Sequence, residues 1–218
     1  FGGEGYDINA NYGVLADLWK YNIATNEWTW MNGPNNVFQF GNYGTLQVAA
    51  STNQPACRHE CGANWVDGSG DFWMYGGAVY YSSNNGFTHN DMWRYSPSTN
   101  LWTWMSGSNN VGNYIVPNHG TLQVAAATNT PGTRTAYSSW KDSNGRFWLY
   151  GGSNLSNLWY GDMWMYDPVT NYWTWMAGSS AANAITTFTV PNVAGNGLPG
   201  ARWENRCTWK SARPATRS

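Results

Sequence analysis

The stretch DMWRYSPSTNLWTWM at residues 91–105 decides the fold, because the chain contains it three times. The other copies are DLWKYNIATNEWTWM at residues 17–31 and DMWMYDPVTNYWTWM at residues 162–176. Each copy has two short runs of alternating aromatic residues, joined by residues that favour tight turns. This pattern predicts a β-hairpin that recurs along the chain.

Two further runs precede each hairpin, and both are expected to be strands. The earlier run begins with an arginine, and the later run is hydrophobic and ends in a glycine pair. Polar turns such as residues 67–70 join the two runs. The sequence thus predicts units of four antiparallel strands, the pattern of a propeller blade. The earlier run lies at residues 58–65, 134–140 and 202–209, and the later run lies at 72–77 and 147–152, with only its end at 1–3.

Composition narrows the class of protein. Charged residues make up 11% of the 218 residues, while Trp and Tyr number 16 and 14, which excludes a disordered chain. The net charge of −1 predicts no nucleic-acid partner, and no apolar run approaches the roughly 18 residues of a membrane span. Few lysines, abundant Asn and Thr, and a glycosylation sequon at Asn154-Leu155-Ser156 favour an extracellular or cell-surface location.

Glycine pairs followed by a Tyr and a Trp that are separated by six residues resemble kelch repeats. The resemblance to the long-repeat kelch propellers of the galactose-oxidase-like superfamily covers the whole chain, and it implies an all-β fold of β-propeller blades. The period is longer than the ~50 residues of an ordinary kelch unit, since 74 positions separate Asp17 from Asp91. The residues that carry the resemblance are Gly2, Gly3, Gly76, Gly77, Gly151, Gly152, Tyr21, Trp28, Tyr95, Trp102, Tyr166 and Trp173.

The resemblance divides residues 1–218 into three four-stranded antiparallel blades with long inserts between them. Rings usually contain about four to eight blades, so the chain is expected to be part of a larger ring or of an oligomer. Shared GTLQVAA segments at residues 44–50 and 120–126 indicate that part of the inserts is structural. The blades are assigned to residues 201–210 with 1–31, to 58–106 and to 134–178, and the inserts to residues 32–57, 107–133 and 179–200.

Long connections of such blades emerge on one face, and short turns emerge on the other, so the inserts are expected to form a binding surface. Aromatic and histidine side chains in the inserts are the candidate contacts. Rings among amides suit a glycan and a protein partner equally well. These candidates are Tyr80, Tyr81, Phe87, His89, Tyr114, His119 and Trp159.

Three cysteines leave the disulfide state open. Cys57 and Cys61 have the spacing of a zinc pair, but no second pair follows, so no metal site is expected. If both lay on one extended strand they would be about 13 Å apart, too far for a bridge. A disulfide from Cys207 to Cys61 or Cys57 is the remaining hypothesis.

Arginines and aspartates recur once in each unit, which predicts one charged pair per blade that joins the innermost strand to its neighbour. A ring of arginines that binds an anion is the alternative. The residues are Arg58, Arg134 and Arg202 with Asp17, Asp91 and Asp162.

No set of residues in the sequence predicts catalysis. Copper oxidases of the superfamily, by the resemblance, use two Tyr and two His with a cross-linked Cys, whereas the three His of this chain are scattered. We therefore expect a non-catalytic binding or assembly module without a cofactor, whose partner is a protein or further copies of itself. A carbohydrate-binding, lectin-like propeller is the alternative, and a fragment of a galactose-oxidase-like enzyme is the weakest one.

Overall fold

A computed structural model describes residues 1–60, 63–82, 85–110, 112, 114–195 and 197–203. The described residues contain fourteen strands and no helix, and the strands pair into antiparallel sheets. The all-β expectation is confirmed. Within the described residues the sheets are separate and none closes on itself.

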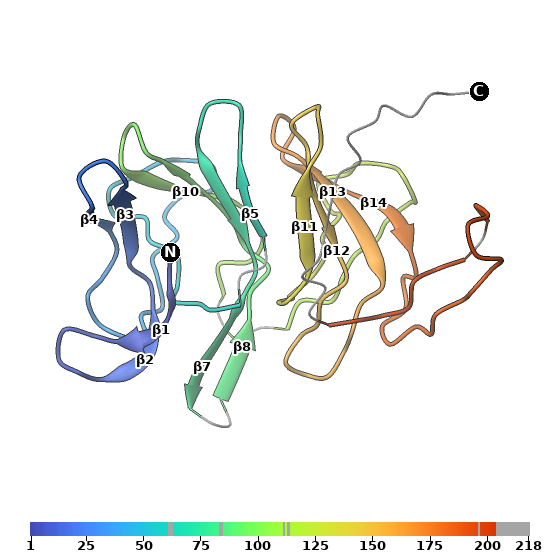
Figure 1. The fold of residues 1–218 in the computed structure, drawn as a ribbon, viewed down its shortest axis with the longest axis horizontal. Coiled ribbons are helices and arrows are strands. Elements are labelled where there is room, and N and C mark those ends of the chain that lie inside the picture. The colour runs from blue at the N-terminus through green and yellow to red at the C-terminus, as the bar shows by residue number, and fades with distance from the viewer. Residues whose placement is uncertain (61–62, 83–84, 111, 113, 196, 204–218) are drawn as a thin grey trace.

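Three sheets stand side by side and are named here sheet I, sheet II and sheet III. Sheet II has the order β10-β9-β6-β5, and sheet III has the order β11-β12-β13-β14. Figure 1 shows sheet I on the left, sheet III on the right and sheet II between them. Sheet I comprises β3 (Leu18–Asn22) and β4 (Glu27–Asn32); sheet II comprises β5 (Ala63–Val66), β6 (Phe72–Tyr75), β9 (Met92–Ser96) and β10 (Leu101–Ser106); sheet III comprises β11 (Ser138–Lys141), β12 (Phe147–Tyr150), β13 (Asp162–Asp167) and β14 (Tyr172–Gly178).

The prediction of three four-stranded units holds for sheets II and III and not for sheet I. Sheet I consists, among the described residues, of the hairpin β3–β4 alone. Phe1 precedes β1, which pairs with β2 and not with β3. The strand predicted at residues 201–210 falls mostly on residues 204–218, which lie outside the described part of the chain.

Two of the predicted connections contain hairpins of their own. Strands β1 (Gly3–Tyr6) and β2 (Tyr12–Leu15) form one, and β7 (Ala78–Ser82) and β8 (Asn85–Thr88) form the other. Both hairpins extend to the lower edge of Figure 1, while the short turns such as that between β5 and β6 lie at the upper edge. In these two places the connection before the repeated hairpin lies on the side opposite to the short turns, as expected.

The strands predicted to start at the arginines are shorter than expected. The strand expected at residues 58–65 begins at Ala63, and the one expected at 134–140 begins at Ser138. A residue between each arginine and its strand has a positive φ, 51° at Glu60 and 52° at Ala136, which interrupts an extended run. Each arginine therefore precedes its sheet.

Aromatic rings form the core between sheets II and III. The ring of Trp65 is stacked on Phe147 with centroids 5.0 Å apart, and Trp73 meets Phe147 edge-on at 5.4 Å. Tyr75 packs edge-on against Trp173 at 5.0 Å. Each of these rings is buried. The strand aromatics of sheets II and III therefore pack between these two sheets.

The shared GTLQVAA segments lie along the outer strand of the following sheet. Near the first segment, Asn53 Nδ2 donates to the carbonyl of Trp102 in β10 at 3.0 Å. Near the second, Asn129 Nδ2 donates to the carbonyl of Trp173 in β14, also at 3.0 Å. The expectation that this part of the inserts is structural is confirmed.

Candidate association surface

Arg58 links sheet II to the unit before it. Its carbonyl accepts a hydrogen bond from Gly3 N at 3.0 Å, so the first unit holds its backbone. Its guanidinium reaches into the second unit, where Nη1 and Nη2 donate to the carboxylate of Asp91 at 2.7 and 2.8 Å. Nη1 also donates to the carbonyl of Gly76 at 2.9 Å. Burial alone would raise the pKa of Asp91, but Arg58 outweighs it and holds that pKa well below its usual range.

Arg134 repeats this link between sheets II and III. Gly77 N donates to its carbonyl at 3.1 Å, and its guanidinium donates to both carboxylate oxygens of Asp162, at 2.7 and 3.1 Å. Burial opposes ionisation of Asp162, and the guanidinium outweighs it, so the pKa is lowered to about 2. Gly76 has no room for a side chain, because a Cβ on it would lie 2.5 Å from the carbonyl oxygen of Arg134. Sheets II and III thus confirm the predicted charged pair.

Each ion pair has a third partner that the sequence analysis did not identify. Tyr43 donates to Asp91 Oδ2 at 2.7 Å, and His119 Nε2 lies 3.0 Å from Asp162 Oδ2. The signal was present, because both residues immediately precede a GTLQVAA segment. His119, one of the predicted binding residues, is therefore engaged in the buried cluster beneath sheet III.

Asp17 is the counterpart of these aspartates in sheet I, and its surroundings differ. It keeps the contact with the following tryptophan, since Trp19 Nε1 donates to Asp17 Oδ2 at 2.6 Å. Trp93 and Trp164 make the same bond to Asp91 and Asp162 at 2.8 Å. None of the ion pairs found among the described residues includes Asp17, which is partly exposed.

The aromatic face of sheet I is exposed. Trp28 is 65% exposed, whereas its counterpart in sheet III, Trp173, is 3% exposed. Trp19 is 48% exposed, whereas Trp164 is fully buried. Tyr21 packs against Trp28 with ring centroids 5.0 Å apart and is also exposed. Trp19, Tyr21 and Trp28 are named here the sheet I face.

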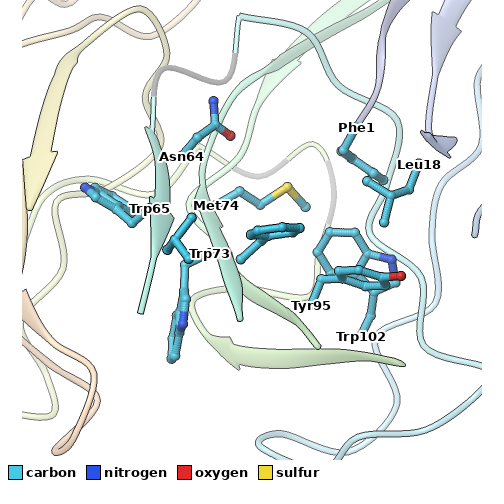
Figure 2. Close-up of a pocket in the computed structure, with 10 residues that line it drawn as sticks. Phe1, Leu18, Asn64, Trp65, Trp73, Met74, Tyr95 and Trp102 are labelled. Atoms are coloured by element: carbon cyan, nitrogen blue, oxygen red, sulfur yellow. The ribbon is translucent and has the colours of Figure 1, made fainter. Parts of the chain in front are cut away.

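A hollow of about 170 Å³ separates sheet I from sheet II. Figure 2 shows Phe1 and Leu18 on one side of it and Met74 on the other. Phe1 meets Trp102 edge-on at 5.2 Å, and Tyr75 meets Trp173 in the same way in the next unit. The hollow is also lined by Asn64, Trp65, Val66, Phe72, Trp73 and Tyr95.

Phe72, which lines the hollow, is less covered than its counterpart in sheet III. Its counterpart Phe147 is fully buried, because Trp65 stacks on it and Trp73 packs against its ring. Phe72 is 45% exposed. The side of sheet II that faces sheet I is therefore only partly covered.

The insert residues predicted to bind a ligand are spread over several places. Phe87 and Tyr114 line one hollow, and Trp159 lines another. Tyr80 packs against His59 with centroids 5.4 Å apart, and the Tyr114 hydroxyl lies 3.1 Å from that of Tyr160. Tyr81 belongs to β7. These residues do not converge on a single described pocket.

His89, another predicted binding residue, is buried at 4% exposure, and its Nε2 atom has no hydrogen-bond partner in the described part of the chain. Burial, assisted by the nearby Arg58, lowers the pKa of His89 to about 4. In the unfolded chain the imidazole of His89 binds a proton below about pH 6.5, whereas in the folded chain it stays neutral down to about pH 4. The free energy of unfolding should therefore fall as the pH drops through this window.

Urea denaturation at pH 4 to 8 measures this fall. The contribution of His89 alone to the free energy of unfolding is at most about 1.4 kcal/mol per pH unit. A His89→Leu variant should show a shallower slope over the same window. Equal slopes for both proteins would contradict the assignment to His89.

The structure describes only one of the three cysteines, Cys57. Cys61 and Cys207 lie outside the described residues, so the proposed disulfide stays a prediction. Cys57 is buried in a cluster with Val14, Ala16 and Val79. The described residues contain no group of three His, Cys, Asp or Glu side chains that could hold a metal ion. They contain no helix that could span a membrane.

Comparisons with known proteins return solved structures only. No protein-family model matches the chain, and no curated protein matches it. The structure of YjhT matches 85% of this chain and 52% of its own, with 14% sequence identity and a TM-score of 0.47. A fungal alcohol oxidase of the AA5 family in complex with copper matches 86% of this chain and 45% of its own, with 10% identity and a TM-score of 0.37. The chain therefore spans about half the length of each of these two proteins.

Proposed function

We propose that this protein is a non-catalytic association module, and that its contact surface is the sheet I face. The exposed Trp28 carries the proposal, because its counterparts Trp102 and Trp173 are both 3% exposed. Contiguous exposed aromatic patches mark sites of protein association. Tryptophan and tyrosine are also the side chains that most often dominate binding energy at protein interfaces.

The packing of sheet II on sheet III shows what kind of surface fits the sheet I face. Sheet II presents Trp65, Trp73 and Tyr75 to sheet III. A partner of the sheet I face is therefore a protein that presents an antiparallel sheet with a similar aromatic triad.

The far side of sheet III carries such a triad, so a second copy qualifies as the partner. Trp140, Trp148 and Tyr150 occupy the strand positions of the sheet II triad and are partly buried. The rings of Trp140 and Trp148 are already stacked, with centroids 5.8 Å apart. The far side of sheet III thus has the aromatic triad that fits the sheet I face of a second copy.

This proposal moves the contact surface from the inserts to a sheet face. The insert residues are divided among separate hollows, whereas the sheet I aromatics are adjacent. The strongest candidate for a glycan contact is Trp159, which is 47% exposed. Its neighbour Asn183 is already engaged, since its Oδ1 accepts from Trp159 N and its Nδ2 donates to the carbonyl of Asn157. The glycan hypothesis stays a prediction with weaker support.

Sedimentation velocity over a range of concentrations tests the proposal. We expect the protein to associate, and Trp28→Ser to weaken association at least tenfold, about 1.4 kcal/mol, because Trp28 is the most exposed side chain of the sheet I face. Val169→Ser is the matched control, since Val169 is 87% exposed in the turn between β13 and β14. A folded protein that stays monomeric at every protein concentration measured and binds no partner protein would contradict the proposal.

A further inference from the structure

We infer that two copies of this protein join head to tail, and that the third insert of one copy covers sheet I of the other. The contact segment is residues 187–195, and its side chain Phe188 packs against Trp19 and Trp30 of the second copy. The inference rests on the association proposed above, and it names the partner and the segment that binds.

The first two inserts show how such a segment covers a sheet. In the first insert, the backbone N of Gln47 donates to the carbonyl of Trp104 in β10 at 2.7 Å. In the second, the backbone N of Gln123 donates to the carbonyl of Trp175 in β14 at 2.8 Å. Each insert therefore adds backbone contacts to the outer strand of the sheet that follows it.

One ring from each of these inserts packs against two tryptophans of the covered sheet. The ring centroid of Tyr43 lies 5.0 Å from that of Trp93 and 5.4 Å from that of Trp104. The ring of His119 packs in the same way on the two equivalent tryptophans of sheet III, with centroids 5.0 and 4.9 Å apart. These contacts bury Tyr43, which is 7% exposed.

The third insert has the same backbone pattern, although its sequence differs. One isolated bridge closes each insert, and the residue five positions after the start of the bridge has a positive φ of 61° to 63°. In the third insert this residue is Asn192. The bridged pairs are Asn42 with Gln54, Asn118 with Thr130, and Thr187 with Leu198.

Phe188 is therefore the counterpart of Tyr43 and His119, because each of the three follows the start of its bridge by one position. Phe188 is 88% exposed. Within the described residues, no isolated bridge joins the segment 187–195 to a strand. Figure 1 shows this segment, in orange-red, on the right side of the molecule and sheet I on the left. The segment has the form of a link but covers no sheet of its own copy.

Sheet I is the sheet that such a segment would complete. Trp19 and Trp30 are paired across β3 and β4, in the register of the two tryptophans that pack on Tyr43 in sheet II. Each is 48% exposed, whereas Trp93 is fully buried. The carbonyl of Trp30 corresponds to the one in β10 that accepts from the first insert, so Asn192 of the second copy supplies the equivalent N–H.

Phe188 differs from its counterparts because its side chain has no polar atom. Tyr43 donates to Asp91 Oδ2 at 2.7 Å, and Asp17 has the place of Asp91 in sheet I. The junction therefore uses ring packing at this point, and a tyrosine in place of Phe188 would add a hydrogen bond to Asp17.

Sedimentation velocity of the full chain tests the junction. Phe188→Ser should weaken self-association at least tenfold, because it removes the ring that packs on the two tryptophans. Ile185→Ser is the matched control in the same insert and should leave association unchanged. Ile185 is 87% exposed, and its counterparts Phe40 and Val116 stay 62% and 63% exposed although their inserts cover a sheet.

A mixture of variants tests the head-to-tail arrangement. Trp30→Ser removes the other half of the junction and should weaken association as Phe188→Ser does. An equimolar mixture of the two should associate at least tenfold more tightly than either alone, because each mixed pair contains one junction with both halves intact. Circular dichroism confirms that each variant is folded.

A gain of affinity tests the contact without removing any group. Phe188→Tyr should tighten self-association at least about threefold, because the new hydroxyl donates to Asp17 of the second copy. The additional change Asp17→Ala should abolish this gain. A packing contact elsewhere on the insert would not respond in this way.

The outcomes separate this inference from the proposed function. A wild type that associates while Phe188→Ser behaves like Ile185→Ser would overturn the junction and leave the association module standing. A wild type that stays monomeric but binds another protein would do the same. A wild type that does neither would overturn both.

Discussion

Replacing Asp91 with alanine should lower the free energy of unfolding by about 3–5 kcal/mol, because it leaves the buried Arg58 without its counter-charge. Both side chains of the pair are fully buried. The change also removes the acceptor for the hydroxyl of Tyr43 and the indole N–H of Trp93. A buried donor that loses its only acceptor adds its own desolvation cost.

Asp17→Ala is the matched control for this prediction. Asp17 occupies the same place in sheet I, but it is partly exposed and belongs to no ion pair among those of the described residues. Its replacement should lower the free energy of unfolding by less than about 1 kcal/mol. Urea denaturation at a protein concentration low enough to keep the chain monomeric measures both, since association would stabilise the folded state. Equal losses at the two positions would contradict the stabilising role assigned to the Arg58–Asp91 ion pair.

The sequence was sufficient to predict every strand of the repeated hairpins. The alternating Trp-Thr-Trp-Met runs became β4, β10 and β14, and the recurrence of Arg58 and Arg134 predicted the two buried ion pairs. Local alternation and turn residues determine such elements, because neighbouring strands of a hairpin need no distant partner. The hairpins β1–β2 and β7–β8 were missed, since their sequences vary between units and were interpreted as connections.

Burial could not be predicted from the same pattern. Trp28, Trp102 and Trp173 occupy identical positions in their repeats, yet only Trp28 is exposed. The difference comes from the preceding unit: Phe1 packs on Trp102 and Tyr75 packs on Trp173, whereas the ring contact found for Trp28 among the described residues comes from Tyr21 of its own hairpin. A repeat therefore specifies the shape of each unit, while the surface available for association depends on which units meet. For this reason the sequence analysis placed the binding surface on the inserts, whereas the surface proposed above is the sheet I face.

Phe147 and Phe72 test this dependence of burial on the neighbouring sheet with one chemical change at two equivalent positions. Phe147→Ala should lower the free energy of unfolding by about 3–5 kcal/mol, because the ring is fully buried between Trp65, Trp73 and Tyr166. Phe72→Ala should cost no more than about half of that in the monomer, since Phe72 is 45% exposed beside the hollow.

The comparison becomes sharper when the chains associate. If a partner that binds the sheet I face also covers Phe72, then Phe72→Ala should weaken association, while Phe147→Ala should act on folding alone. Urea denaturation of the dilute monomer and sedimentation of the concentrated protein separate the two effects. Equal destabilisation of the monomer by both variants would show that sheet I already covers sheet II fully, and the hollow would then offer no place for a second chain.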